Sequence, residues 1–160
     1  MLLGGARVHR AAVGLRCSGG ERLMFELFEH TADVGLRIRA ADLNGLFAEA
    51  ARGLFSLIVE NMDDVRPGRQ CSFCLEADNP TELLVDWLAE LLFVFDTKHL
   101  LFVEFDVRID AEHKLEATAR GETVDETRHR LEHEVKAITY HGLTVHRDGP
   151  GWMAEVIVDI

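Results

Sequence analysis

The fold class depends first on the segment Asn79-Pro-Thr-Glu-Leu-Leu-Val-Asp-Trp-Leu-Ala-Glu-Leu-Leu-Phe-Val-Phe95. Its first four residues are typical of a helix start, because Asn79 can cap the helix and proline suits the first helical position. Glu82 completes a capping-box-like motif. The apolar side chains that follow recur on one broad helical face, and such a stripe is far more often core than a cofactor site. The segment therefore predicts a helix that packs against the rest of the domain.

A second amphipathic helix is predicted upstream of this segment, where apolar residues recur at helical spacing from Leu43 to Ile58 and Asp42 is a candidate cap. Alternation of apolar and polar residues predicts strands in seven further segments, at residues 25–30, 36–39, 71–76, 101–109, 115–119, 135–145 and 152–160. Strands interrupted by two helices indicate an α+β fold. We expect a two-layer domain, with a mixed β-sheet of about seven strands and two main helices packed on one face.

The chain of 160 residues is long enough for one domain with a genuine core. Residues 1–23 carry four arginines against Glu21 and show no clear periodicity, so we expect a disordered extension there. Met24 immediately precedes the first patterned segment, which makes a mis-assigned start an equally good account of the extension. Residues 24–160 are expected to form the single domain, and the segment 121–133, which is highly charged, is expected to be an exposed connection or short helix.

The net charge is −11, and because residues 1–23 contribute +3, residues 24–160 carry −14. An acidic surface repels the phosphate backbone, so stable direct binding of nucleic acid is not expected, whereas cations or a basic protein partner fit. Solubility is the commoner reason for acidity. Three cysteines do not make a secreted disulfide framework and no apolar run is long enough to span a membrane, which favours a cytoplasmic location. Cys71 and Cys74 have redox-motif spacing, but a strand would send them to opposite faces, which favours a structural role.

The ending Glu155-Val-Ile-Val-Asp159-Ile160 predicts a strand that places a carboxylate beside the terminal carboxylate. A second carboxylate lies near the start of the domain, in Glu29-His-Thr-Ala-Asp33-Val-Gly35. Oxygen ligands gathered from these two segments could hold a hard cation. On the residues alone, Asp33 is more often a turn or capping residue. His141 is expected on the face opposite Lys136 and Tyr140, unless Gly142 marks a bulge.

Two patches together resemble the archease family. They are Glu29–Gly35 and His133-Glu-Val-Lys-Ala-Ile-Thr-Tyr-His-Gly-Leu143, the latter followed by the terminal Val-Ile-Val-Asp159-Ile160. The resemblance covers Phe25 to Ile160. It implies a non-catalytic protein that assists the RtcB-type RNA ligase, which joins ends bearing a 2′,3′-cyclic phosphate or 3′-phosphate to 5′-hydroxyl ends. Members promote GTP-dependent guanylylation and multiple turnover of that ligase in tRNA splicing or RNA repair, and the GTP is used by the ligase.

The resemblance also implies a cation site formed by Asp33, Asp159 and the terminal residue Ile160. Oxygen ligands favour calcium, magnesium or manganese. By similarity Lys136 is a candidate for coupling to the ligase, and His30 and His141 are candidates for orienting the ligands. Two alternatives stay open: a metal-dependent hydrolase that uses the two aspartates, and a general protein-folding modulator that acts as a chaperone.

Overall fold

The computed structural model describes residues 24–30 and 33–160. Its elements, in chain order, are β1 Met24–His30, β2 Asp33–Ala40, α1 Leu43–Ile58, a 3-10 turn at Met62–Asp64, β3 Arg69–Glu76, α2 Pro80–Lys98, β4 Leu100–Ile109, β5 Lys114–Thr123, β6 Ala137–Asp148 and β7 Gly151–Asp159. The disorder predicted for residues 1–23 concerns a segment outside the described residues.

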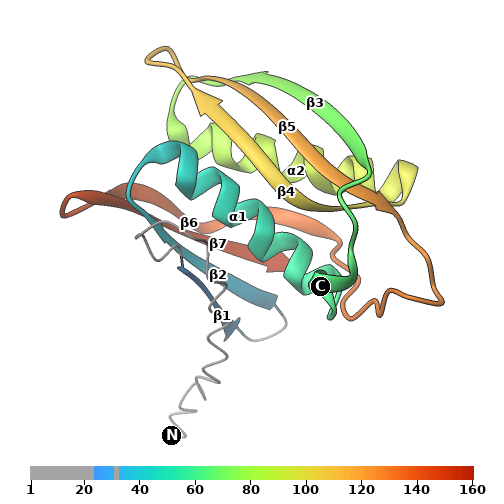
Figure 1. The fold of residues 1–160 in the computed structure, drawn as a ribbon. Helices are drawn as coiled ribbons and strands as arrows, with labels where there is room; N and C mark the ends of the chain where they lie inside the picture. Colours follow the sequence, from blue (N-terminus) through green and yellow to red (C-terminus); the bar gives the residue numbers. More distant parts are fainter. Residues whose placement is uncertain (1–23, 31–32) are drawn as a thin grey trace, which may run out of the picture.

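The α+β class is confirmed, with two main helices and seven strands in the described part of the chain. The arrangement differs from the expected mixed sheet. The strands form two sheets, with the orders β1-β2-β7-β6 and β3-β5-β4, and every pairing is antiparallel. Both helices contact strands of both sheets and lie between them (Figure 1). The helices thus form a middle layer, because each sheet has one apolar face that needs cover.

Both helices begin at the residues that the sequence predicts. The Asn79 side chain accepts a hydrogen bond from the Glu82 backbone N–H at 2.9 Å, and Pro80 occupies the first turn of α2. Asp42 caps α1 in the same way, accepting from the Gly45 N–H at 2.7 Å. These bonds satisfy backbone donors that have no partner within the helix.

Within residues 24–30 and 33–160, no helix combines the length and the apolar character needed to cross a membrane.

The core sits around α1, which is buried over most of its circumference because a sheet lies on either side of it. Phe55 of α1 has ring contacts with Phe102 and Phe105 of β4, at centroid distances of 5.6 and 6.0 Å. Trp87 of α2 is fully buried, and its indole N–H donates to the Phe47 carbonyl at 3.0 Å. This bond links the two helices and leaves no buried indole donor unsatisfied.

The expectation of an exposed connection at residues 121–133 is wrong for one of its residues. The His129 side chain is fully buried. Its Nδ1 accepts a hydrogen bond from the Asp125 backbone N–H at 2.9 Å, so Nε2 carries the proton and donates to Glu122 at 2.7 Å. Arg128 also bonds Glu122, at 2.7 Å. A polar network therefore holds this connection against β5. In the sequence His129 is surrounded by charged residues, so its burial could not be predicted.

Candidate functional site

The start of β2 and the end of β7 meet at one end of the four-stranded sheet (Figure 1). Asp33 is directly opposite Asp159 in the antiparallel register, and both residues are partly buried. Residues in such a pair have Cα atoms about 5 Å apart. The two segments that carry the aspartates are therefore neighbours in space although most of the chain separates them.

The outer strands add one residue on each side of this pair. His30, Asp33, Asp159 and Ala137 thus form a row across the end of the sheet, which we call the aspartate row. The backbone of His30 in β1 is opposite Asp33, and its side chain is outside the described residues. On the other side, Ala137 of β6 is opposite Asp159. The Lys136 backbone N–H donates to the Asp159 carbonyl at 2.8 Å, and the Lys136 side chain is exposed. Lys136 thus lies next to the aspartate pair.

Side chains of β1, β2 and β7 pack together at the neighbouring positions of the sheet and support this row. The Phe28 ring of β1 covers Gly35 of β2 so closely that a Cβ on Gly35 would overlap the ring. The Arg37 guanidinium lies 5.3 Å from the centroid of the same ring, and its Nε donates to Glu155 at 2.8 Å. Three strands are therefore tied together two to four residues away from Asp33. The ring explains why glycine follows the aspartate in this motif.

The sequence left open whether Gly142 marks a bulge, and the structure confirms that it does. The β6–β7 register shifts between Thr139 and Thr144, and Gly142 has a φ of +68°, which favours glycine. His141 lies exposed within this bulge, beyond the row that contains the aspartates. Tyr140, next to it, is also exposed. In the sequence Gly142 indicated a possible bulge, but nothing indicated that the bulge would leave an aromatic ring exposed to solvent.

The aspartates at this end offer the kind of ligand atom that a hard divalent cation prefers. The two facing side chains offer only oxygen atoms, which calcium, magnesium and manganese prefer. Within the described part of the chain no group of three or more His, Cys, Asp or Glu side chains could hold a metal ion. The third ligand in the sequence prediction is instead the terminal carboxylate of Ile160, whose side chain packs against the core. That set of ligands stays a prediction.

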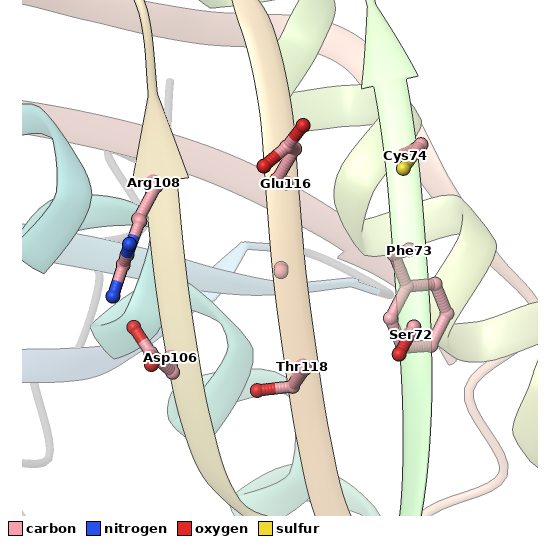
Figure 2. A pocket seen from close by; sticks show the side chains of 8 residues that line it. Ser72, Phe73, Cys74, Asp106, Arg108, Glu116 and Thr118 are labelled. Carbon is pink, nitrogen blue, oxygen red and sulfur yellow. The ribbon is translucent and has the colours of Figure 1, made fainter.

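A second candidate is a hollow on the exposed face of the β3-β5-β4 sheet (Figure 2). Its polar lining is Ser72, Cys74, Asp106, Arg108, Glu116 and Thr118. The lining mixes both signs of charge, as expected for the solvent-facing side of an antiparallel sheet. Cys74 points into this face while Cys71 packs against the core, and both thiols are free. The opposite-face prediction for the two cysteines is confirmed.

Glu122 is a strongly hydrogen-bonded carboxylate that the sequence did not single out. Burial would raise its pKa, but hydrogen bonds from Arg128, the Arg66 backbone N–H and His129 outweigh burial and hold the pKa below the usual 4.5. The network anchors the connection that runs from β5 to Lys136.

Residues 25–160 match a family model described as the archease protein family (MTH1598/TM1083). The chain belongs to the archease family. The archease of Methanopyrus kandleri is 40% identical over 139 residues, which cover 85% of this chain and 99% of that protein. The archease of Pyrococcus abyssi is 37% identical over 140 residues, covering 85% and 98%.

Solved structures agree with this family assignment. The solution structure of protein 1598 from Methanobacterium thermoautotrophicum is similar, with a TM-score of 0.73 and 33% identity over 85% of this chain and 98% of that one. A crystal structure from Thermotoga maritima, called an archease and a possible chaperone, has a TM-score of 0.58 and 18% identity over 83% and 94% of the two chains. The second likeness shows the shared archease fold alone.

Proposed function

We propose that this archease-family protein activates an RtcB-type RNA ligase, promoting its GTP-dependent guanylylation and its multiple turnover in tRNA splicing or RNA repair. The observation that carries the proposal is the placement of Asp33 opposite Asp159 at the end of the sheet. A domain whose role is to assist another enzyme needs a defined end that can reach that enzyme, and this end gathers the carboxylates and Lys136.

In this proposal Asp33, Asp159 and the terminal carboxylate of Ile160 hold a calcium, magnesium or manganese ion. The bound ion would supply positive charge that coordinates oxygen atoms of the partner or of its nucleotide. Asp33 and Asp159 would keep the ion at the sheet end because their strands are paired and the Phe28 stack fixes the adjoining positions. The exposed Lys136 ammonium would contact an anionic group of the ligase–nucleotide complex, and His30 and His141 would orient ligands.

Electrostatics supports a protein partner that is basic around its active region. The domain from residue 24 to residue 160 carries −14, which attracts a positively charged protein surface and repels free RNA. Association with the ligase is therefore expected to weaken as salt increases, because exposed charges are screened. An association that does not change with salt would contradict electrostatic docking. We place the encounter in the cytoplasm and assign no catalytic residue to this chain.

The role is tested by RNA ligation with the cognate ligase limiting, in the presence of GTP and a divalent metal. We expect the ligase alone to stop early and the mixture to continue for many turnovers. The same protein without ligase, incubated with RNA or nucleotide, tests the hydrolase alternative, and suppression of aggregation of unrelated proteins tests the chaperone alternative. Turnover without ligase, or client protection without ligase stimulation, would overturn the proposed role.

A further inference from the structure

Tyr140 is the most exposed large hydrophobic residue in the described part of the chain. Its relative exposure is 65%, compared with 59% for Phe93 and 50% for Leu131. Phe93 lies on α2, whereas Tyr140 lies on β6, the strand that pairs with the strand carrying Asp159. An exposed aromatic ring at a defined place beside a candidate site is a frequent anchor of protein–protein contacts.

The ring is presented by a bulge, which we define as residues 140–143. Between the pairs Thr139–Ile157 and Thr144–Glu155, β6 has these four residues and β7 has Val156 alone. Immediately before the bulge, the Thr139 hydroxyl donates to the Ile157 carbonyl at 3.0 Å, and within it Gly142 has a φ of +68°. Bulges of this kind commonly redirect a side chain next to a functional site.

The bulge is close to the aspartate row. Ala137 is opposite Asp159, and Tyr140 follows three residues later, so the two positions are about 10 Å apart along the strand. Lys136 is exposed on the other side of Ala137. The bulge is therefore near enough to the Asp159 end for one protein surface to contact both.

The other rings near this sheet indicate what Tyr140 would bind. Arg37 lies over the Phe28 ring at 5.3 Å, and Arg147 lies over the Trp152 ring at 5.1 Å. Within the described residues, no arginine or lysine of this chain lies over Tyr140. A guanidinium or ammonium group from a partner could take that position, because the face of an aromatic ring attracts cations.

We propose that Tyr140 and the bulge form the contact on which a cationic surface of the partner ligase docks beside the Asp33–Asp159 end. The inference rests on the proposed function and adds to it the surface and the kind of group that is recognised. The occupant is a protein surface bearing arginine or lysine, since the charge of −14 on residues 24–160 attracts such a surface. The same charge opposes an RNA strand at this position.

The test measures the affinity of the purified cognate ligase for the full chain by titration calorimetry, with calcium present. Tyr140→Ala removes the ring, and Phe93→Ala removes a similarly exposed ring from α2 as the matched control. We expect Tyr140→Ala to weaken binding by about tenfold or more and Phe93→Ala to leave it unchanged. Tyr140→Phe keeps the ring face and should retain most of the affinity. Both positions are exposed, so the melting temperatures should match that of the wild type.

The outcomes separate this inference from the proposed function. If the wild type stimulates the ligase while Tyr140→Ala and Phe93→Ala bind it equally well, the docking surface is wrong and the function stands. If the wild type neither binds nor stimulates the ligase, both are wrong. In another outcome, Tyr140→Ala binds the ligase as tightly as the wild type, but its complex with the ligase no longer retains labelled RNA. The ring would then contact RNA, and the proposed protein contact would be wrong.

Discussion

Asp33 of β2 lies directly opposite Asp159 of β7, so two carboxylates share one end of the four-stranded sheet. Like charges in directly opposed positions of an antiparallel pair destabilise it. The arrangement is therefore unfavourable unless something compensates for the repulsion. A divalent cation held between the two strands would do so. Removing one aspartate should therefore not reduce the stability of the protein when metal is absent, but should reduce the stability that it gains from bound metal.

The first prediction concerns Asp159→Asn. In buffer with a chelator, the variant should be at least as stable as the wild type because the repulsion with Asp33 is removed. In excess calcium the wild type should gain about 2.7 kcal/mol of unfolding free energy at a hundredfold excess over the dissociation constant, and the variant should gain much less. Urea unfolding with and without calcium measures both effects. Asp106→Asn, on the exposed face of the other sheet, is the control, and an equal calcium effect in both variants would contradict the site.

The second prediction concerns Gly35→Ala. The new Cβ would overlap the Phe28 ring, so the ring must move away and the stack with Arg37 must open. We expect a loss of about 1–3 kcal/mol in unfolding free energy, as for overpacked sites. Urea denaturation measures it. Gly68→Ala is the matched control, because a Cβ there meets no atom within 4 Å, and its effect should stay within about 0.5 kcal/mol. Equal effects at the two glycines would show that the packing of the Phe28 ring does not require glycine at position 35.

The third prediction concerns pH and Glu122, whose pKa lies below the usual 4.5. A carboxylate with a lowered pKa in the folded protein stabilises the fold above its unfolded pKa, and this stabilisation is lost as the pH falls through the folded pKa. The unfolding free energy of the wild type should therefore fall as the pH drops below 4.5. Glu122→Gln should be less stable near neutral pH and should show a shallower decline in that range. Parallel pH profiles for the two proteins would refute this role of Glu122.

The fourth prediction concerns the terminal carboxylate. A short extension after Ile160 replaces it with a peptide bond, so calcium affinity and ligase stimulation should both fall. The same residues added before Met1 provide the control and should change neither. Calorimetry with calcium and the limiting-ligase assay give the two readouts. An extended protein that keeps both properties would remove Ile160 from the set of ligands.

The sequence predicts the helices well because their signals are local. Asn79 and Asp42 cap the helices as expected, and the apolar stripe of α2 is core. The division of the strands into two sheets depends instead on distant pairings, such as Arg37 opposite Glu155. Alternation within a strand indicates which face is buried but does not name the partner strand. A single mixed sheet was therefore as compatible with the pattern as two antiparallel ones.

The candidate site was only partly predictable. On the residues alone a turn was the favoured interpretation of Asp33, and a cation site shared with Asp159 was an open alternative. The family resemblance favoured that alternative, and the strand register places the two residues opposite each other. His129 could not have been selected, because a histidine surrounded by charged residues in the sequence gives no sign of burial until Glu122 and Asp125 are placed around it. The cation ligands and the roles of His30, His141 and Lys136 stay predictions.

The most direct test of the central claim is the guanylylation of the cognate ligase by labelled GTP, measured in a single turnover with calcium or another divalent metal present. The wild type, Asp33→Ala, Asp159→Ala and the control Asp106→Ala are compared at equal concentration. The account predicts that the wild type and Asp106→Ala accelerate labelling of the ligase and that both site variants lose most of the acceleration. Equal acceleration by all four proteins would show that the aspartate pair at the end of the sheet is not how this protein acts.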